Sequence, residues 1–320
     1  MARYLVYRSL QNLATFLAFL TFTFLLIQAQ PGDIVSFYIA NPKIPPEARE
    51  ELRQALGLDR PLWEQYFVYM GNFFRGDLGV SFGHYPRPVI EVLVERIPRT
   101  VALFLTATLT SFFLGFTLGK VIAWRRGHAL EYLATRGGVS LYTVFTPWFA
   151  LMMIWLFAFY LGWLPVGKFL NPVLWQGAPL EANPLFQRLL LTAGALGVAL
   201  LFIVTGAGRF LPRRIGPLRW SGVAAAVGIS ALLWARSGLG PYAADILVHL
   251  VLPVLTLTLI SFGGTMLLMR SSMLETLRED FVLAARAKGL PEGVVRDKHA
   301  ARNALLPVVT SLVFSLALTV

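Results

Sequence analysis

Residues 246–269 read ILVHLVLPVLTLTLISFGGTMLLM, and residues 270–289 continue as RSSMLETLREDFVLAARAKG. The first part holds a single ionisable residue, His249, and a run of this length crosses a bilayer core of about 30 Å as a helix. The second part is polar, and its spacing predicts an amphipathic helix over 271–288 that Gly289 is placed to end. A membrane span leading into a polar surface helix is the unit from which we predict this fold.

The rest of the composition agrees with a membrane protein. Of the 320 residues, 56% are hydrophobic and only 14% are charged, whereas a soluble domain carries about 25% charged residues. Apolar runs that could each cross a membrane fall at 9–29, 100–123, 139–163, 189–206, 220–236, 246–269 and 304–320. The sequence therefore predicts an all-α, polytopic helical bundle of about seven spans in a lipid bilayer. There are no cysteines, which excludes disulfides and thiolate metal sites.

The distribution of charge predicts an orientation. The net charge is +11, and with a cytoplasmic N-terminus the four inside segments hold 17 of the 28 Lys and Arg residues. Most acidic residues fall outside, which is the positive-inside pattern of a multi-pass membrane protein rather than the footprint of a nucleic-acid-binding protein. The loop 207–219 has four arginines and no acid, so it acts as an inside anchor between two extra spans.

The two ends of the chain carry separate expectations. The first apolar run follows Arg3 and Arg8 and exceeds a usual signal-peptide core, so we interpret it as an uncleaved span, with a cleaved signal as the alternative. The chain stops inside the apolar run Leu305–Val320, and a carboxylate near mid-membrane is costly, so we expect a fragment that lacks C-terminal spans. Between the first two runs, Pro46–Leu56 and Pro61–Phe74 could form short helices.

Composition alone leaves two interpretations of the polar stretch 270–303. One is a solvated loop held to anionic lipid by its arginines. The other is a helix–Gly–helix platform, with a second polar helix over about 292–302, whose small side chains before Gly289 let another protein approach closely. The residues by themselves favour neither of these two interpretations.

Several segments resemble one family. Glu279-Asp-Phe-Val-Leu-Ala-Ala-Arg-Ala-Lys-Gly-Leu290 and Lys298-His-Ala-Ala-Arg-Asn-Ala-Leu-Leu-Pro307 resemble the EAA loop of binding-protein-dependent ABC importers, specifically the B-type permeases of the dipeptide/oligopeptide (peptide/nickel) family. The stretches 57–66, 75–82 and 88–100 look like the first external loop of these subunits and the lead into their second span. The general EAA pattern begins with Glu where Leu283 stands, and has Leu-Pro where Ala301 and Arg302 stand. Both departures are usual in the B-type branch.

The resemblance implies a type I ABC importer transmembrane-domain fold. Residues 1–98 would form the first span and external loop, and 99–320 the transmembrane domain, truncated at its C-terminus, with 270–303 as its cytoplasmic coupling loop. Residues 166–245 match nothing in the family and would be an inserted two-span hairpin. The implied setting is the inner (plasma) membrane of a prokaryote.

The resemblance also implies a mechanism and partners. The coupling loop would sit in a groove on a separate ATPase, with Ala284, Ala285 and Ala287 allowing close approach, Gly289 forming the turn, and Glu279, Asp280, Arg286 and Lys288 making polar contacts. The partners would be a second, C-type permease subunit, two ATP-binding subunits and an external substrate-binding protein. No cofactor is expected in this chain, since it has no Gly-x-x-x-x-Gly-Lys-Ser/Thr loop and ATP would bind to partners. We expect no catalytic residues, and the solute would be a peptide.

Other sequence features are weaker. Ser111, Gly115 and Gly119 follow a small-x-x-x-small pattern that suits close helix packing. The four histidines, His84, His128, His249 and His299, are scattered, so we expect no metal site. A self-contained secondary transporter or channel is the alternative function, but the runs between 100 and 269 have no Asp or Glu in their cores. An intramembrane enzyme is less favoured still, because no catalytic set is visible.

Overall fold

The computed structural model describes residues 2–29, 60–81, 84, 87–210 and 216–319. Within these ranges every regular element is a helix, and one isolated bridge joins Val80 and Pro88. It divides into two compact units, Met1–Arg96 and Ile97–Val320. The all-α prediction is confirmed. The predicted helix at 46–56 and the centre of the arginine-rich loop, 211–215, lie outside the described residues.

The first unit contains α1 (Ala2–Gln28) and α4 (Leu62–Phe74). Aromatic side chains join the two helices: the rings of Phe24 and Tyr66 lie 5.4 Å apart, and the Tyr66 hydroxyl is 2.8 Å from Oγ1 of Thr21. The Gln28 amide donates to the side chain of Gln65 at 2.8 Å. The short helix that the sequence indicates at 61–74 is therefore present, and it packs against the first apolar helix.

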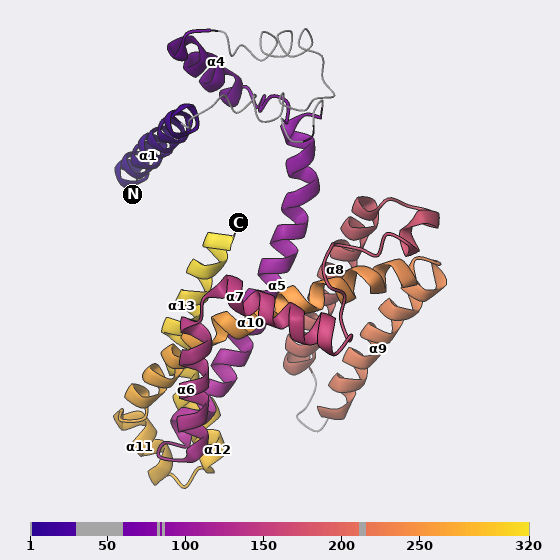
Figure 1. The fold of residues 1–320 in the computed structure, drawn as a ribbon. Helices are drawn as coiled ribbons and strands as arrows, with labels where there is room; N and C mark the ends of the chain where they lie inside the picture. The colour runs from indigo at the N-terminus through magenta and orange to yellow at the C-terminus, as the bar shows by residue number, and fades with distance from the viewer. Residues whose placement is uncertain (1, 30–59, 82–83, 85–86, 211–215, 320) are drawn as a thin grey trace. The chain divides into compact units, whose positions relative to one another are not determined.

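The second unit begins within α5 (Val89–Trp124), a helix that crosses the boundary between the units. The elements that follow are α6 (Ala129–Thr143), α7 (Thr146–Met153), the π-helix η2 (Ile154–Tyr160), the 3-10 helix η3 (Leu174–Gly177), α8 (Ala182–Phe210), α9 (Gly216–Arg236), α10 (Gly240–Thr276), α11 (Asp280–Ala287), α12 (Glu292–Val294), the π-helix η5 (Val295–Ala300) and α13 (Ala301–Thr319). Figure 1 shows α11 and α12 together at the end of the unit where α6 begins.

Helix α10 is central to the second unit, since it contacts α6, α7, α8, α9 and α13. Its buried side chains include Ile246, Met266 and Met273, all with no exposed surface. Met266 packs with Ile122 of α5, and Met273 packs with residues of α11 and α13. The apolar run 246–269 thus belongs to the helix of the second unit against which α6, α7, α8, α9 and α13 pack.

Five helices of the described chain are long and apolar enough to cross a membrane: Arg3–Gln28, Val89–Trp124, Ala182–Ile203, Gly240–Thr276 and Glu292–Ala317. A sixth span is obtained if α6 and the helix after it are taken as one bent pair. Within α9, the segment Trp220–Arg236 is apolar but shorter than these five helices. These helices account for the seven predicted runs, though α9 is the weakest, as the glycines in its sequence indicate.

The apolar run 139–163, predicted as a span, is not one continuous helix. Helix α6 ends at Thr143, and the helix Thr146–Tyr160 leaves it at an angle of 107°. Val144 at the break is extended, and Pro147 stands at the start of α7. Proline lacks an N–H, and its ring would clash with the carbonyl four residues before it, here that of Thr143, so α6 stops at that residue. In the first turn of α7 the missing N–H is tolerated.

The segment 166–245, which the sequence predicts as an insertion, contains the helical hairpin of α8 and α9, which lie side by side in Figure 1. Trp234 donates from Nε1 to Oγ1 of Thr192 at 3.2 Å, and a Cβ on Gly222 would lie 3.4 Å from the Ile203 side chain. These pairings are those of antiparallel helices. The base of the hairpin joins α10 through the buried cluster of Leu185, Phe186, Leu239, Ala243 and Ile246.

Candidate functional site: the polar platform after α10

The predicted single helix over 271–288 is wrong, because the structure divides it. Helix α10 continues beyond its apolar run as far as Thr276, and a turn follows in which the Glu279 N–H donates to the Thr276 carbonyl at 3.2 Å. Glu279 has extended backbone, with φ −73° and ψ 144°, and α11 begins at Asp280. A carboxylate in the first turn of a helix interacts favourably with the helix dipole, which suits a new start here.

The C-terminus of α11 is closed by backbone hydrogen bonds around Gly289. The Gly289 N–H donates to the Arg286 carbonyl at 2.9 Å, and the Leu290 N–H donates to the Ala285 carbonyl at 3.4 Å. This pair of bonds is the Schellman motif, which requires a left-handed residue after the helix. Gly289 supplies it, with φ +71°. A Cβ there would meet nothing within 4 Å, so the glycine is required by its backbone conformation and not by space.

The inner face of α11 packs on the chain itself. Val282 is fully buried and Ala285 is 4% exposed, and both belong to a cluster with Met273 of α10, Val295 of η5 and Ala304 of α13. Leu290, beyond the Schellman turn, packs on the same cluster. The small side chain of Ala285 therefore brings α11 close to its own domain. We predicted this residue to face a partner, and the structure instead turns it inward.

The outer face of α11 is apolar and exposed. Phe281 is 40% exposed and Leu283 is 54% exposed, and Ala284 and Ala287 are exposed beside them. The predicted polar residues Glu279, Asp280 and Lys288 are also exposed. These side chains lie on the eight-residue helix α11 and on its two caps, Glu279 and Lys288. Because the inner face of α11 packs on the domain, they form a small surface with apolar residues inside a charged border.

Arg286 connects α11 to its neighbours. Its guanidinium carbon lies 5.5 Å above the ring of Trp124 at the end of α5, and its Nε is 3.7 Å from Oε1 of Glu292. A cation over an indole ring and an opposite charge are both favourable interactions. Arg286 thus holds α11 against α5 and α12, whereas the sequence predicted it as a polar contact to a partner.

The second polar helix, predicted over about 292–302, does not end there. Helix α12, η5 and α13 run on as one helical segment, Glu292–Ala317. Asp297 in η5 accepts hydrogen bonds from Nε and Nη2 of Arg296, at 2.9 and 2.8 Å, and its Oδ1 lies 3.0 Å from Nζ of Lys120 on α5. Asp297 therefore joins the platform to the end of α5.

A second charged contact was missed by the sequence analysis. Glu131, in the first turn of α6, is only 5% exposed. Its Oε1 accepts a hydrogen bond from Nε of Arg270 at 2.9 Å, and its Oε2 accepts the Gly127 N–H at 2.7 Å. Arg270 is the first polar residue after the apolar run of α10. An acid with an arginine so distant in sequence carries no local signal, so only the fold reveals the pair.

Close helix packing holds α10 in place above the platform. Gly115 and Gly119 of α5 lie against α10, where an added Cβ would stand 2.7 Å from the Phe262 carbonyl oxygen and 2.5 Å from that of Met266. Ser111, predicted on the same face, is 3% exposed. On α6, Gly138 lies opposite Gly263 of α10. At the platform itself, Oγ of Ser272 donates to the Ala304 carbonyl at 2.8 Å.

No metal site emerges in the part of the chain that the structure describes, where no group of three or more His, Cys, Asp or Glu converges. His249 lies on α10 with its Nδ1 2.8 Å from the Asp245 carbonyl. The Asp245 carboxylate in turn accepts the Asn171 N–H and the Trp175 indole N–H, both at 2.9 Å. This acid is thus fully engaged in fastening the segment before α8 to α10.

Comparison with known proteins places these features in one family. Residues 111–320 match the model of the binding-protein-dependent transport system inner membrane component, and residues 1–106 match the N-terminal model of the same transport system membrane component. The larger match covers α6 to α13, and so includes the whole platform.

Named relatives are similar over most of their length. The dipeptide transport system permease protein DppB of Lactococcus lactis subsp. cremoris is 29% identical over 97% of this chain and 76% of its own. The di/tripeptide transport system permease protein DppB of Pseudomonas aeruginosa is 32% identical over 92% and 74%. The oligopeptide transport system permease protein AppB of Bacillus subtilis is 27% identical over 97% and 77%.

Proposed function

Because the chain belongs to the family of binding-protein-dependent transport system inner membrane components, we propose that it is a permease subunit of an ATP-driven importer of dipeptides or oligopeptides. The relatives named for dipeptide, di/tripeptide and oligopeptide transport support the choice of substrate. The family and the five long apolar helices make the chain a multi-pass inner-membrane protein. The positive-inside distribution of charge supports a cytoplasmic N-terminus.

The exposed face of α11 is the proposed docking surface for an ATP-binding subunit. The observation that carries this assignment is the contrast between its two faces: Val282 and Ala285 are buried in the domain, whereas Leu283, Ala284 and Ala287 face outward. An exposed apolar surface with a charged border is typical of a protein interface. Small alanine side chains let a groove in the partner approach the helix backbone.

Movement of α11 would reach the spans through fixed contacts. Arg286 ties α11 to the end of α5, Ser272 ties α10 to α13, and Arg270 ties α10 to α6. A push on α11 by closing ATPases would therefore move α5, α6, α10 and α13 together rather than bend a loose loop. In the proposed mechanism this motion alternates the pathway between inward-facing and outward-facing states.

The chain would supply part of the pathway and no ATP chemistry. A second permease subunit of the C type would complete the pore, two ATP-binding subunits would hydrolyse ATP, and an external binding protein would deliver the peptide. The absence of a Gly-x-x-x-x-Gly-Lys-Ser/Thr loop from the sequence supports ATP binding by partners.

Co-purification with an ATP-binding subunit encoded beside this chain tests the docking surface. Ala284→Arg places a long charged side chain on the exposed face of α11, so we expect it to reduce recovery of the ATPase at least tenfold. Ala129→Arg makes the same change at an exposed position on α6 and is expected to keep the complex. Full recovery with Ala284→Arg, or peptide uptake in vesicles that lack any ATPase, would contradict the proposal.

A further inference from the structure

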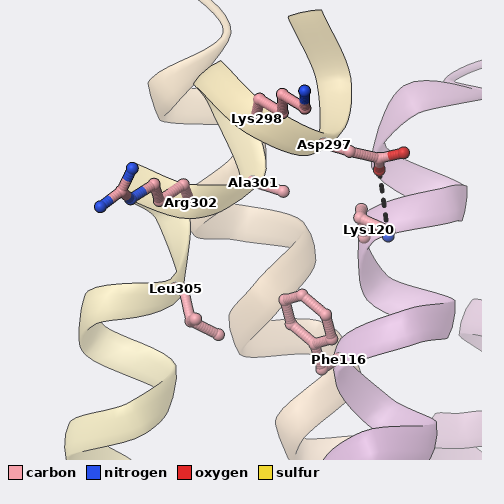
Figure 2. Close-up of a pocket in the computed structure, with 7 residues that line it drawn as sticks. All are labelled: Phe116, Lys120, Asp297, Lys298, Ala301, Arg302 and Leu305. Carbon is pink, nitrogen blue, oxygen red and sulfur yellow. Dashed lines mark ion pairs between the residues drawn. The ribbon is translucent and has the colours of Figure 1, made fainter. Parts of the chain in front are cut away.

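A surface hollow of about 500 Å³ lies between the end of α5 and the start of α13. Figure 2 shows Phe116 of α5 facing Leu305 of α13, with Ala301 above them, and these three residues form an apolar wall. The other lining residues are charged and lie toward the polar platform. The hollow is thus apolar at one end and charged at the other.

The charged end is positive. The one acid that lines it, Asp297, is already bound by Arg296 and by Lys120, whose Nζ is 3.0 Å away. Lys298 and Arg302 also line the hollow and are exposed, and no hydrogen bond or ion pair within the described chain holds either of them. In Figure 2, Arg302 extends outward from the rim, so that it widens the positive border. The rim thus carries two exposed cations that no hydrogen bond or ion pair within the described chain engages.

The position of the hollow fits the boundary between membrane and water. Lys120 stands one turn before the end of α5 at Trp124, where the apolar run of that helix stops. Lys298, Arg302 and Leu305 follow one another at helical spacing, so one face changes from cationic to apolar at the same level. Beyond Leu305, the large side chain of Leu306 is 77% exposed, as expected for a helix that meets acyl chains.

We propose that this hollow binds the headgroup and the upper acyl chain of one anionic phospholipid. The phosphate would lie between Lys298 and Arg302, and the acyl chain would run along Phe116, Ala301 and Leu305. A ligand with both a negative group and an apolar tail matches the two ends of the hollow, whereas free phosphate would leave the apolar wall in water. The site is separate from the exposed face of α11, and it does not depend on the proposed transport activity.

Native mass spectrometry of the full chain in detergent tests the site. Phosphatidylglycerol and phosphatidylcholine with identical acyl chains are titrated in parallel, and we expect a preference for phosphatidylglycerol. Each surface cation contributes about fivefold in affinity for an anionic lipid. Lys298→Gln with Arg302→Gln should therefore reduce phosphatidylglycerol binding by roughly 25-fold and leave phosphatidylcholine binding unchanged. Millimolar inorganic phosphate should not displace the bound lipid.

The matched control removes two other exposed cations of the platform, by Arg278→Gln with Lys288→Gln. This control should keep the preference, and circular dichroism should confirm that both double variants remain helical. Equal binding of the two lipids by the unaltered chain would overturn the proposal. An equal loss of phosphatidylglycerol binding in the control would also overturn it, because that result would mean that general surface charge attracts the lipid. If Lys298→Gln with Arg302→Gln instead released an ATP-binding subunit and kept the lipid preference, the hollow would be a protein contact and the proposal would be wrong.

Discussion

Gly263 of α10 and Gly138 of α6 lie in direct backbone contact. A Cβ built on Gly263 would stand 2.4 Å from the carbonyl oxygen of Gly138, which is closer than real Cβ atoms approach. Gly115 and Gly119 of α5 also approach the backbone of α10, where an added Cβ would lie 2.7 and 2.5 Å from carbonyl oxygens. Glycines therefore bring α5 and α6 close to the backbone of α10, just before α10 leaves its apolar run for the platform.

Gly263→Ala should destabilise the protein by about 1–3 kcal/mol, because the clash is with backbone that cannot rotate away. Gly138→Ala should cost less, since the atom nearest its Cβ is the flexible end of the Met266 side chain, at 2.4 Å. Thermal unfolding in detergent measures both. Gly137→Ala, where a Cβ meets nothing within 4 Å, is the control and should be neutral or slightly stabilising. Equal melting temperatures for Gly263→Ala and Gly137→Ala would contradict the packing argument.

Gly289→Ala should cost about 1–2 kcal/mol, because an L-residue is strained at φ +71° although the space around it is open. Gly289→Asn should cost less, since asparagine tolerates the left-handed region better than alanine. The measurement is thermal unfolding combined with recovery of the ATP-binding subunit, because a disturbed Schellman turn would shift α11. Gly293→Ala, in right-handed helix with open space, is the comparison. A Gly289→Ala protein as stable as Gly293→Ala would show that the turn is not required.

Glu131→Ala should destabilise the protein by about 2 kcal/mol, because it leaves the Gly127 N–H and the Arg270 guanidinium without their buried acceptor. A double-mutant cycle with Arg270→Ala should give a coupling energy of about 1–2 kcal/mol. The exposed pair Arg87 and Glu91, 3.7 Å apart, serves as the reference and should couple by less than about 0.5 kcal/mol. Similar coupling energies in the two cycles would mean that the buried pair has no special role in joining α6 to α10.

Ala285→Arg should prevent folding of the platform, because it forces a charge into the cluster around Val282 and Met273. Ala284→Arg should leave the protein monodisperse, since that side chain is exposed. Size-exclusion chromatography and hydrogen exchange of residues 270–303 distinguish the two variants. The assignment of faces on α11 fails if Ala285→Arg is as well folded as Ala284→Arg.

Asp245→Ala should loosen the segment before α8, because the Asn171 N–H and the Trp175 indole N–H both lose their acceptor. Limited proteolysis should then cut within 162–181 at least several-fold faster. Asp245→Asn keeps one acceptor oxygen and should have a smaller effect. The control is Glu181→Ala, an exposed acid in the same region, which should not change the cleavage rate. An unchanged rate in Asp245→Ala would exclude this anchor.

Some features were predictable because their signals are local. The apolar runs indicate their helices, because an apolar segment of bilayer length can make all its backbone hydrogen bonds internally only as a helix. The helix at 62–74 and the stop of α11 at Gly289 also follow from neighbouring residues. The bend between α6 and α7 had a local signal in Pro147, but the run 139–163 was judged by hydrophobicity alone. The break at Glu279 had a weaker signal, because the alanines after it favour helix.

The roles of individual platform residues were not predictable in the same way. Ala284 and Ala285 are neighbours of one residue type, yet one is exposed and the other is buried against α10 and α13. Arg286 was predicted to face a partner, but it lies over Trp124, a residue far away in the sequence. Glu131 and Asp297 each have a local partner, but their contacts with Arg270 and Lys120 on other helices have no signal in the neighbouring sequence.

The sequence by itself determined that this protein is a helical membrane permease, because hydrophobic length, charge distribution and the segment 279–307 are properties of the chain read in order. Only the tertiary structure decided which face of α11 is exposed, how α10 is held, and where the amphipathic hollow lies. The physical reason is that burial and ion pairing depend on residues brought together from distant helices. Those contacts exist only after α5, α6 and α13 have packed around α10.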